Sequence, residues 1–341
     1  DAGRTRLATL VPLGKPDLSG NELAYVTEAI KNGELTHRGP FVRKLEKAFS
    51  DYIGLPSLAC SSGTGALHLA LLSRGIGRGD EVIIPTLSFG TLASVVMAVG
   101  ATPVLVDADP DTWGMNKKDA YADRTRSTVA IVSVNLYGLD AGDFRGMRNI
   151  VIEDGCESLG FVPPKGDIAC YSFYGNKVIT SGEGGMICGD FGGAAKWRDG
   201  GFDENYSHDV PGLNYRMTNI QAAVALAQLE RIETLVAARR RNAEAYASRI
   251  RGKGKWLFVA QLQDPARASA ELKMIGVETR RVFTPIHRSH AFRYRTTGKY
   301  PVAEEIWKRG LVLPTGPHVT AQQVEMICEV IAKWQSQPIP M

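Results

Sequence analysis

The sequence lacks any long hydrophobic run. Its longest nearly apolar segment, at 92–101, is far shorter than the roughly 18 residues that suggest a membrane-spanning helix. We therefore expect no membrane partner. The 36 glycines follow no fixed period, which excludes a collagen-like fibre. A chain of 341 residues with 44% hydrophobic and 22% charged residues is instead typical of a globular protein with a large core.

The sequence also lacks an excess of either charge. It has 40 basic and 36 acidic residues, a net charge of +4, which is too balanced to predict binding to nucleic acid. One basic stretch stands out after a helical pattern, consisting of Arg239, Arg240, Arg241, Arg249, Arg251, Lys253 and Lys255. No aromatic residues are interleaved there to stack on bases. We therefore interpret this stretch as a solvated helix face and expect no nucleic-acid partner.

Cysteine is scarce and scattered. The five cysteines are Cys60, Cys156, Cys170, Cys188 and Cys328. No C-x-x-C pair occurs, which excludes zinc-ribbon and thioredoxin-like motifs, and we expect no metal site. An odd number of dispersed cysteines fits a reducing compartment, so we expect a cytoplasmic protein.

Short apolar runs alternate with helical periodicity from residue 19 to 235. The first helix is expected over 19–33, with Ser19 as its N-cap and Gly33 as its end. Strands are expected within 57–60, 81–89, 102–109, 128–138 and 149–155. Strands that alternate with helices predict a mostly parallel sheet with helices on both faces.

The pattern changes beyond Asn219. Residues 220–250 form one helical pattern of roughly 30 residues, long enough to bridge two domains. A smaller α+β region follows, with a strand and two helices expected at 256–262, 265–275 and 320–335. We therefore predict a large domain over 1–235 and a small C-terminal domain over 236–341.

A glycine-rich turn at 61–72 joins a strand to a helix. Gly63 and Gly65 would let the backbone approach a ligand closely, and the N-terminus of a helix favours a phosphate. The segment is not a Walker A loop, since no Gly-Lys-Ser/Thr follows. It also departs from the dinucleotide fingerprint, because His68 stands where a glycine is needed. A tight turn without a ligand is the alternative.

Two further segments carry reactive side chains. Glu153 and Asp154 lie at the carboxyl end of an expected strand, where open α/β sheets bind ligands, although such a carboxylate can also serve as a helix N-cap. Lys177 is the single lysine of a segment rich in Gly, Ser, Thr and aromatic residues. Such surroundings can lower the pKa of a lysine and make it a nucleophile, whereas the alternative is a solvated loop lysine.

Together these elements match the requirements of pyridoxal 5′-phosphate (PLP). The cofactor needs a phosphate cup, an aspartate that keeps its pyridine nitrogen protonated, and a lysine that bonds to its aldehyde. In this chain they occur in the order cup, Asp154, Lys177. Fold-type I PLP enzymes have the same order.

The chain resembles the DegT/DnrJ/EryC1/StrS family of PLP-dependent nucleotide-sugar aminotransferases over nearly its whole length. The matching motifs, in order, are SSGTGALHLAL, GRGDEVIIPTLSF, GATPVLVDAD, VIEDGCESLG, YSFYGNKVITSGEGGM, LNYRMTNIQAAVALAQLERI, GVETRRVFTPIH and AEEIWKRGLVLPTGP. The resemblance implies an α/β, aspartate aminotransferase-like fold of type I. Its large domain would hold a mostly parallel sheet, and its smaller C-terminal domain would be α+β.

The resemblance also implies roles for individual residues. Lys177 would bond to the cofactor and shuttle the proton, Asp154 would bind the pyridine nitrogen, and Glu157 would approach the ring hydroxyl. The residue that stacks on the ring and those that hold the phosphate would be Phe89, Gly63, Thr64 and Ser172. Asn214 would reach the phosphate of the neighbouring subunit, which implies a homodimer with shared active sites.

The chain departs from the family pattern at three places. Asn135 and Leu159 stand where histidines are usual, and both are expected near the cofactor. The region after Arg251 is shorter than usual. Arg216, in the same segment as Asn214, has a purely structural role as the alternative to a functional one. Arg280 and His287 could be surface residues near the small domain.

The segment around Lys177, at 171–186, is most similar to C4-specific members of the family, in particular the perosamine synthases. This implies amino transfer from L-glutamate to C4 of a nucleotide-linked 4-keto-6-deoxyhexose for polysaccharide biosynthesis, with GDP-4-keto-6-deoxymannose giving GDP-perosamine as the best match. Alternatives are a C3-specific enzyme, a UDP- or dTDP-sugar enzyme, or a non-catalytic regulator. A sugar dehydratase of this family would have histidine in place of Lys177.

Overall fold

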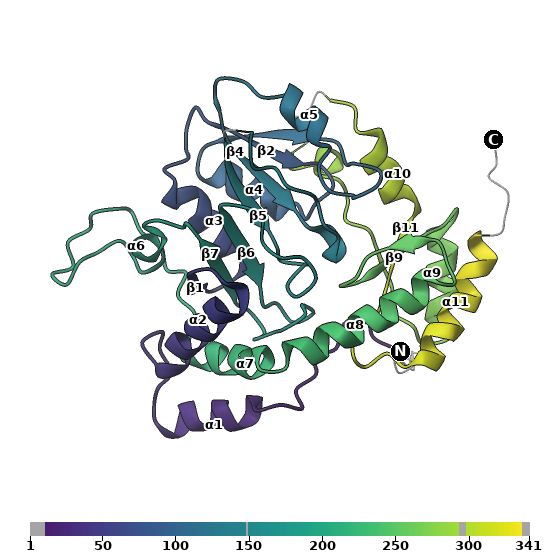
Figure 1. Cartoon of the computed structure of the whole chain (residues 1–341), viewed down its shortest axis with the longest axis horizontal. Coiled ribbons are helices and arrows are strands. Elements are labelled where there is room, and N and C mark those ends of the chain that lie inside the picture. Colours follow the sequence, from purple (N-terminus) through teal and green to yellow (C-terminus); the bar gives the residue numbers. More distant parts are fainter. Residues whose placement is uncertain (1–10, 148, 293–297, 336–341) are drawn as a thin grey trace, which may run out of the picture.

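The computed structural model describes residues 11–147, 149–292 and 298–335 (Figure 1). Its larger sheet has seven strands in the order β1-β7-β6-β5-β4-β2-β3. The bounds are β1 Ser57–Cys60, β2 Glu81–Pro85, β3 Thr102–Val106, β4 Thr128–Val134, β5 Ile150–Asp154, β6 Ile168–Ser172 and β7 Gly185–Gly189. The strands from β6 to β3 pair in parallel, and β7 is antiparallel to both of its neighbours. The predicted mostly parallel sheet is therefore confirmed.

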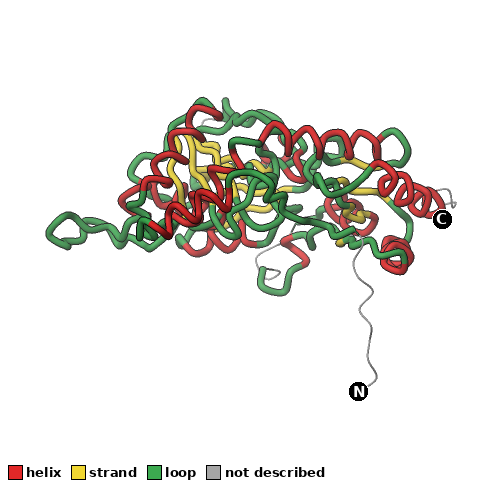
Figure 2. The backbone as a smooth tube through the Cα atoms, turned by 90° about the horizontal axis from the view of Figure 1, so that it is seen from below, coloured by secondary structure: helices red, strands yellow, loops and turns green. Residues whose placement is uncertain are grey.

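Helices cover both sides of this sheet (Figure 2). They are α1 Glu22–Lys31, α2 Pro40–Ile53, α3 Gly63–Ser73, α4 Thr91–Ala98, α5 Lys117–Ala122, α6 Ala194–Arg198, α7 Asn219–Leu229 and α8 Ile232–Ala247, with a 3₁₀ turn at Leu136–Gly138. Because both faces are covered, central strands such as β2 bury consecutive apolar side chains, and Val82, Ile83 and Ile84 are inaccessible to solvent.

The first helix begins later than expected. It starts at Glu22 after Asn21, and its N-cap side chain forms no capping hydrogen bond. Ser19 is not the cap, because its hydroxyl donates to Asp17 instead, at 2.6 Å. The expected end of the helix is correct, since Gly33 has a φ of +69°, which glycine adopts without strain.

The long helical pattern over 220–250 is two helices and not one. α7 ends at Leu229 and α8 begins at Ile232. The two residues between them bind the N-terminal segment: Glu230 accepts a hydrogen bond from Tyr25, and Arg231 forms an ion pair with Asp17. We attribute the break to these tertiary contacts, which periodicity does not reveal.

A second sheet follows α8 in the chain. Its strands are antiparallel in the order β10-β11-β9-β8, with bounds β8 Gly252–Lys253, β9 Phe258–Gln261, β10 Arg280–Arg281 and β11 Gly310–Leu313. Its helices are α9 Pro265–Met274, α10 Pro301–Arg309 and α11 Ala321–Gln335, with a 3₁₀ turn at Ile286–Arg288. This α+β region is the one expected from the sequence.

Helix α8 extends from the large sheet to the smaller one (Figure 1). Leu235 and Val236 in its first half belong to the core around the large sheet, whereas Ala243 and Tyr246 belong to the core of the smaller one. The domain boundary near residue 235 stays a prediction, and it falls within this helix. In the described ranges, no helix has the length and apolarity needed to cross a bilayer.

Candidate active site

A cavity of about 390 Å³ lies at the carboxyl ends of the parallel strands, beside the N-terminus of α3. It is lined by nearly all of the residues predicted to contact the cofactor, namely Gly63, Thr64, Phe89, Asp154, Glu157, Ser172 and Lys177. Residues far apart in the sequence therefore meet in one place. Asn214 is the exception, because it does not line the cavity within a single chain.

The predicted phosphate cup forms the start of α3. Ser62 caps the helix by accepting the N–H of Gly65 at 3.0 Å, which leaves the N–H groups of Gly63 and Thr64 ahead of the first capping bond. A Cβ at Gly63 would lie 2.7 Å from Cβ of Ser172 and 2.8 Å from Sγ of Cys156. Only glycine fits at position 63, where the start of α3 lies against the end of β6. Free N–H groups and the helix dipole make the site suitable for a phosphate.

Asp154 is the last residue of β5, and its carboxylate lines the cavity. One carboxylate oxygen accepts the N–H of Cys156 at 3.1 Å. Burial raises the pKa of Asp154, while the hydrogen bond from Cys156 and the charge of Lys177 act in the opposite direction. A buried carboxylate of this kind is stabilised by a cation from the cavity side. The protonated pyridine nitrogen of PLP is such a cation.

Lys177 extends from the connection between β6 and β7. Its Nζ lies 3.4 Å from Oε1 of Glu157 and 4.2 Å from the ring centroid of Trp256. The Trp256 indole donates to the carbonyl of Asn176 at 3.2 Å, next to the lysine. The amine is thus held at the cavity wall by one carboxylate and one aromatic face.

Glu157 lies between the lysine and the large sheet. Its Oε2 accepts the N–H of Tyr137 at 2.9 Å. Burial raises the pKa of Glu157, and the charges of Lys177 and Arg280 oppose that effect. The predicted contact of Glu157 with the cofactor's ring hydroxyl is not tested by the cavity alone and stays a prediction.

Aromatic rings form one wall of the cavity. Phe89 is 59% exposed, and its ring centroid lies 5.4 Å from that of Phe283. Phe283 in turn stacks on Tyr137 at 5.9 Å with an interplanar angle of 10°. The free face of Phe89 at the cavity is available for the expected stacking on a planar ligand.

Two residues of the Asn-Tyr-Arg segment lie outside the cavity. Asn214 is exposed and pairs through its backbone with Asp199. Arg216 donates to the carbonyl of Asp199 at 3.0 Å, which supports its structural role. The connection from α6 to α7 projects away from the body of the chain (Figure 1). Contact between Asn214 and a second subunit therefore stays a prediction.

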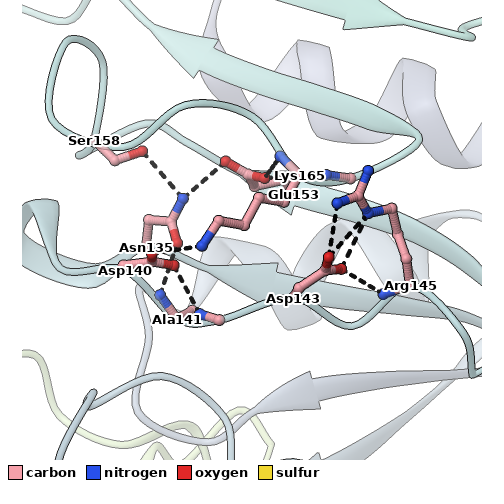
Figure 3. A network of polar contacts seen from close by, with 10 residues as sticks. Asn135, Asp140, Ala141, Asp143, Arg145, Glu153, Ser158 and Lys165 are labelled. Carbon is pink, nitrogen blue, oxygen red and sulfur yellow. Dashed lines mark hydrogen bonds and ion pairs between the residues drawn. The ribbon is translucent and has the colours of Figure 1, made fainter.

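Asn135 and Leu159 do not themselves line the cavity, and their expected position near the cofactor stays a prediction. The Asn135 side chain donates to Glu153 at 2.8 Å and accepts the N–H of Ala141 at 3.0 Å (Figure 3). Side chains alternate along a strand, so Glu153 faces away from the cavity that Asp154 lines, and Asn135 joins Glu153 there. Leu159 belongs to the hydrophobic core.

Arg239 is buried rather than solvated, so this part of the basic stretch was wrongly interpreted. Its guanidinium donates to the carbonyl of Lys177 at 3.2 Å and to that of Trp256 at 3.4 Å. Burial lowers the pKa of Arg239 to about 10. The helical spacing from Leu235 and Val236 placed Arg239 on the buried face of α8, which was the signal available in the sequence.

Arg280 and His287 are not plain surface residues. Arg280 lines the cavity with its guanidinium 4.5 Å from the ring centroid of Phe283. The His287 ring bonds to Thr86 at 2.7 Å and to Glu304 at 3.2 Å, so it fixes the chain near the end of β2. Sequence reasoning also missed Trp256, whose strand-like surroundings gave no indication of a position beside Lys177.

The residues around this cavity fit PLP. The N-terminus of α3 would hold the phosphate, the buried carboxylate of Asp154 would suit a protonated pyridine nitrogen, and the amine of Lys177 lines the same cavity. Within the described ranges no group of three or more His, Cys, Asp or Glu side chains is placed to hold a metal ion.

Comparison with known proteins agrees with this site. Residues 16–332 match the model of the DegT/DnrJ/EryC1/StrS aminotransferase family. The chain is 37% identical to a GDP-perosamine synthase of Caulobacter vibrioides, covering 93% of this chain and 96% of the relative. It is 36% identical to a GDP-perosamine synthase of Escherichia coli O157:H7, covering 96% and 99%.

Solved structures share the fold. A family aminotransferase from Brucella abortus superposes with a TM-score of 0.85 at 28% identity, covering 93% of this chain and 96% of that one. A putative sugar aminotransferase from Streptococcus pneumoniae was solved in two forms. Its PMP form gives a TM-score of 0.88 at 23% identity, covering 96% of this chain and 98% of that one. Its PLP form gives a TM-score of 0.87 at 24% identity, covering 95% and 99%. The fold is therefore that of a type I PLP transferase, and PLP is the cofactor. The chain belongs to the DegT/DnrJ/EryC1/StrS aminotransferase family and is a PLP-dependent sugar aminotransferase.

Proposed function

We propose that this chain transfers an amino group from L-glutamate to C4 of a nucleotide-linked 4-keto-6-deoxyhexose. The acceptor is GDP-4-keto-6-deoxymannose and the product is GDP-perosamine. The placement of Lys177, Asp154 and the α3 N-terminus around one cavity carries the aminotransferase chemistry. The choice of sugar is supported by three relatives named GDP-perosamine synthase, which are 30%, 36% and 37% identical to the chain over nearly its full length.

The reaction has two halves that share one site. In the first, the donor gives up its amino group, which the site retains, and a Cα proton; water supplies the new keto oxygen, and the donor leaves as 2-oxoglutarate. In the second, the amino group replaces the C4 carbonyl oxygen of the sugar, which leaves as water. PLP supplies an electron sink that stabilises negative charge at the reacting carbon when it is bound.

The chain's own residues handle charge and protons. Nζ of Lys177 takes the proton from the donor carbon and returns it to the sugar carbon in the second half. Glu157, whose Oε1 lies 3.4 Å from Nζ, orients that amine. The buried carboxylate of Asp154 would stabilise the positive charge of the bound cofactor's ring. The rings of Phe89 and Trp256 limit the access of water to the lysine.

A C3-specific reaction is the second candidate. A relative from Acidithiobacillus ferrooxidans, named as a 3-aminotransferase of UDP-N-acetyl-3-dehydro-glucosamine, is 33% identical over 85% of this chain and 88% of its own length. Its substrate differs in nucleotide and in the position of the keto group. The test of function must therefore identify the aminated carbon as well as detect turnover.

The experiment is product analysis by NMR. Purified, PLP-loaded protein is incubated with L-glutamate and with GDP-, UDP- and dTDP-linked ketosugars in turn. We expect turnover of GDP-4-keto-6-deoxymannose with the new amine at C4. An amine at C3, or turnover of a free keto acid alone, would overturn the proposal. Lys177→Ala protein serves as the control for uncatalysed amination.

We further propose that the working form is a cytoplasmic homodimer. Asn214 is exposed in one chain and is placed, by family resemblance, to complete the phosphate site of a partner subunit. All five cysteines are free, which suits a reducing compartment.

A further inference from the structure

Tyr137 has a strained backbone close to the cavity. Its φ is +55° and its ψ is 23°, which is the left-handed region that a bulky residue rarely adopts. Its side chain is fully buried, and its N–H donates to Oε2 of Glu157 at 2.9 Å. Strain of this kind persists only where surrounding contacts enforce it, and it is common beside reactive groups. Contacts from neighbouring segments must therefore hold Tyr137 in this conformation.

Asn135 makes such contacts from within the same turn. Its carbonyl accepts the N–H of Gly138 at 3.2 Å, and its side-chain oxygen accepts the N–H of Ala141 at 3.0 Å. Its own N–H donates to the carbonyl of Asp154 at 3.2 Å. These three bonds close the turn that contains Tyr137 and attach it to the end of β5.

The side-chain amide of Asn135 is fixed in turn by a buried carboxylate. Its Nδ2 donates to Oε1 of Glu153 at 2.8 Å and to Oγ of Ser158 at 3.3 Å (Figure 3). The other oxygen of Glu153 accepts the N–H groups of Lys165 at 2.7 Å and Gly166 at 3.1 Å. Both ends of the buried amide are thus bonded, and the amide cannot rotate without leaving a buried carboxylate oxygen unpaired.

The N–H of Tyr137 acts on the carboxylate that contacts the lysine. Tyr137 binds one oxygen of Glu157, and the other oxygen lies 3.4 Å from Nζ of Lys177. Burial raises the pKa of Glu157, whereas the charge of Lys177 and the N–H of Tyr137 lower it. The backbone of Tyr137 therefore helps to keep this carboxylate ionised and directed at the amine.

The same turn also places the aromatic ring beside the lysine. The carbonyl of Tyr137 accepts the N–H groups of Lys255 at 2.8 Å and Trp256 at 3.1 Å. The ring centroid of Trp256 lies 4.2 Å from Nζ of Lys177. The two groups that contact the lysine amine are thus both bonded to the backbone of one strained residue.

We propose that Asn135 is a positioning residue for the amino transfer. Its side chain holds Tyr137 in the left-handed conformation, and the N–H of Tyr137 then fixes Glu157 beside the lysine. Asn135 acts through these groups and not by contact, since it does not line the cavity. The proposal rests on the amino transfer proposed above, in which Glu157 orients the amine of Lys177.

The test observes the Tyr137 amide directly by NMR. PLP-loaded protein labelled with nitrogen-15 tyrosine contains 11 labelled residues, and Y137F identifies the signal of Tyr137 because that signal disappears. In the unmodified protein this signal should shift with pH as Glu157 ionises, and its hydrogen should exchange slowly. In N135A we expect exchange to be about 10-fold faster or more. The pKa of Glu157 should be higher in N135A, because the carboxylate has lost a donor.

N135D gives a graded version of the same change. Aspartate retains an oxygen for the N–H of Ala141 but sets a second carboxylate against Glu153. In acid the two carboxyl groups share a proton and stay bonded, whereas at higher pH both are charged and repel. The defect relative to unmodified protein at the same pH should therefore be small in acid and approach that of N135A as pH rises. The other titratable groups within electrostatic reach of Glu153 are unchanged in this comparison, namely Asp140, Arg145, Lys165, Cys170 and Tyr171.

A single-turnover measurement connects the amide to the chemistry. The yellow PLP protein loses its colour with L-glutamate, and N135A should react about 10- to 100-fold more slowly at saturating donor. The donor concentration that gives half the maximal rate should change little. The matched control is N149A, because Asn149 lies before the opposite end of β5 and donates to the carbonyl of Thr128 at 2.7 Å. N149A should leave both the Tyr137 signal and the rate unchanged.

The outcomes separate positioning from a purely structural role. Lower thermal stability or a slower reaction in N135A, with the Tyr137 amide unchanged, would overturn the proposal. A defect in N135D that does not depend on pH, or the same changes in N149A, would also contradict it. The NMR measurements need no turnover. If the unmodified protein reacts with L-glutamate but aminates no 4-ketosugar, the proposed function fails while the result for Asn135 still stands.

Discussion

Two adjacent carboxylates at the end of β5 illustrate how single residues divide the work. Glu153 accepts hydrogen bonds from Asn135 at 2.8 Å and from the N–H of Lys165 at 2.7 Å, away from the cavity (Figure 3). Asp154 lines the cavity, and its carboxylate accepts the N–H of Cys156 at 3.1 Å. Alternation along the strand thus places one carboxylate in a hydrogen-bond network away from the cavity and the other at the cavity wall.

The variant Asp154→Asn should retain the fold and lose the chemistry. Asparagine has the shape of aspartate but no charge to stabilise a protonated pyridine nitrogen, so we expect kcat to fall by several orders of magnitude. Steady-state kinetics measure the loss. Glu153→Gln is the matched control, and it should lower thermal stability with a much smaller effect on kcat. Near-normal activity in Asp154→Asn would show that this carboxylate has another role.

Lys177 should be the single lysine that bonds to the cofactor. Lys177→Ala should abolish transamination and still bind PLP through the α3 N-terminus, since the cup does not involve this side chain. Borohydride reduction of the holoprotein followed by peptide mapping should label Lys177. Lys165→Ala is the control, because Lys165 pairs with Asp140 outside the cavity. Label on any other lysine would contradict the assignment.

At the scale of elements, α8 connects the cavity to the smaller sheet. Its Arg239 donates to the backbone of Lys177, from the large-sheet region, and of Trp256, from the smaller region. The side chain of Asn242, one turn further, donates to the carbonyl groups of Thr315 and Val319 at 3.1 Å each. One helix thus holds the lysine segment, the tryptophan and a C-terminal loop in a fixed relation.

Arg239→Met should separate positioning from stability. Methionine fills the same space and removes the cost of burying a charge, so we expect a change of about 1–2 kcal/mol or less in the free energy of unfolding. Lys177 loses its carbonyl anchor, and kcat should fall about 10-fold with little change in KM. Arg240→Met, one residue on and exposed, should change neither quantity. If kcat fell only in proportion to the loss in the free energy of unfolding, Arg239 would have a purely structural role.

At the scale of the molecule, the active cavity is closed by parts of both sheets. Asp154 and Ser172 come from the large sheet, whereas Trp256 and Arg280 come from the smaller region.

Several large apolar side chains are exposed on and beside α1, namely Leu18, Leu23, Ile30 and Leu35. Such a surface is typical of an interface between protein chains.

Mixing an impaired variant with an inactive one should test the shared active site. Asn214→Ala alone should weaken PLP binding about 10-fold or more, since it removes a hydrogen bond to a charged phosphate. Co-expression with Lys177→Ala should restore activity, because one of the two sites in the hybrid then has an intact Lys177 and an intact partner's Asn214. Light scattering should report at least a dimer. A stable, active, PLP-loaded monomer of 37.0 kDa would refute the shared site.

The sequence by itself determined the parts of the site that are local. The turn before α3, the end of β5 and the lysine segment each carry their chemistry within a few residues, and the order of Gly63, Asp154 and Lys177 already indicated PLP. The alternation of apolar runs with helical periods was sufficient to predict the large sheet, because buried parallel strands require continuous apolar residues. The cavity indeed collects all of these segments.

Only the tertiary structure decided what surrounds them. Trp256 and Arg280 lie about 80 to 100 residues beyond Lys177 in the chain, and no local pattern indicates that they contact the same space. Asn135, expected near the cofactor, bonds to Glu153, and the break between α7 and α8 falls at the residues that contact the N-terminal segment, where Arg231 pairs with Asp17. The reason is physical: periodicity reports which face of a segment is buried, whereas the identity of its neighbours depends on how distant segments pack.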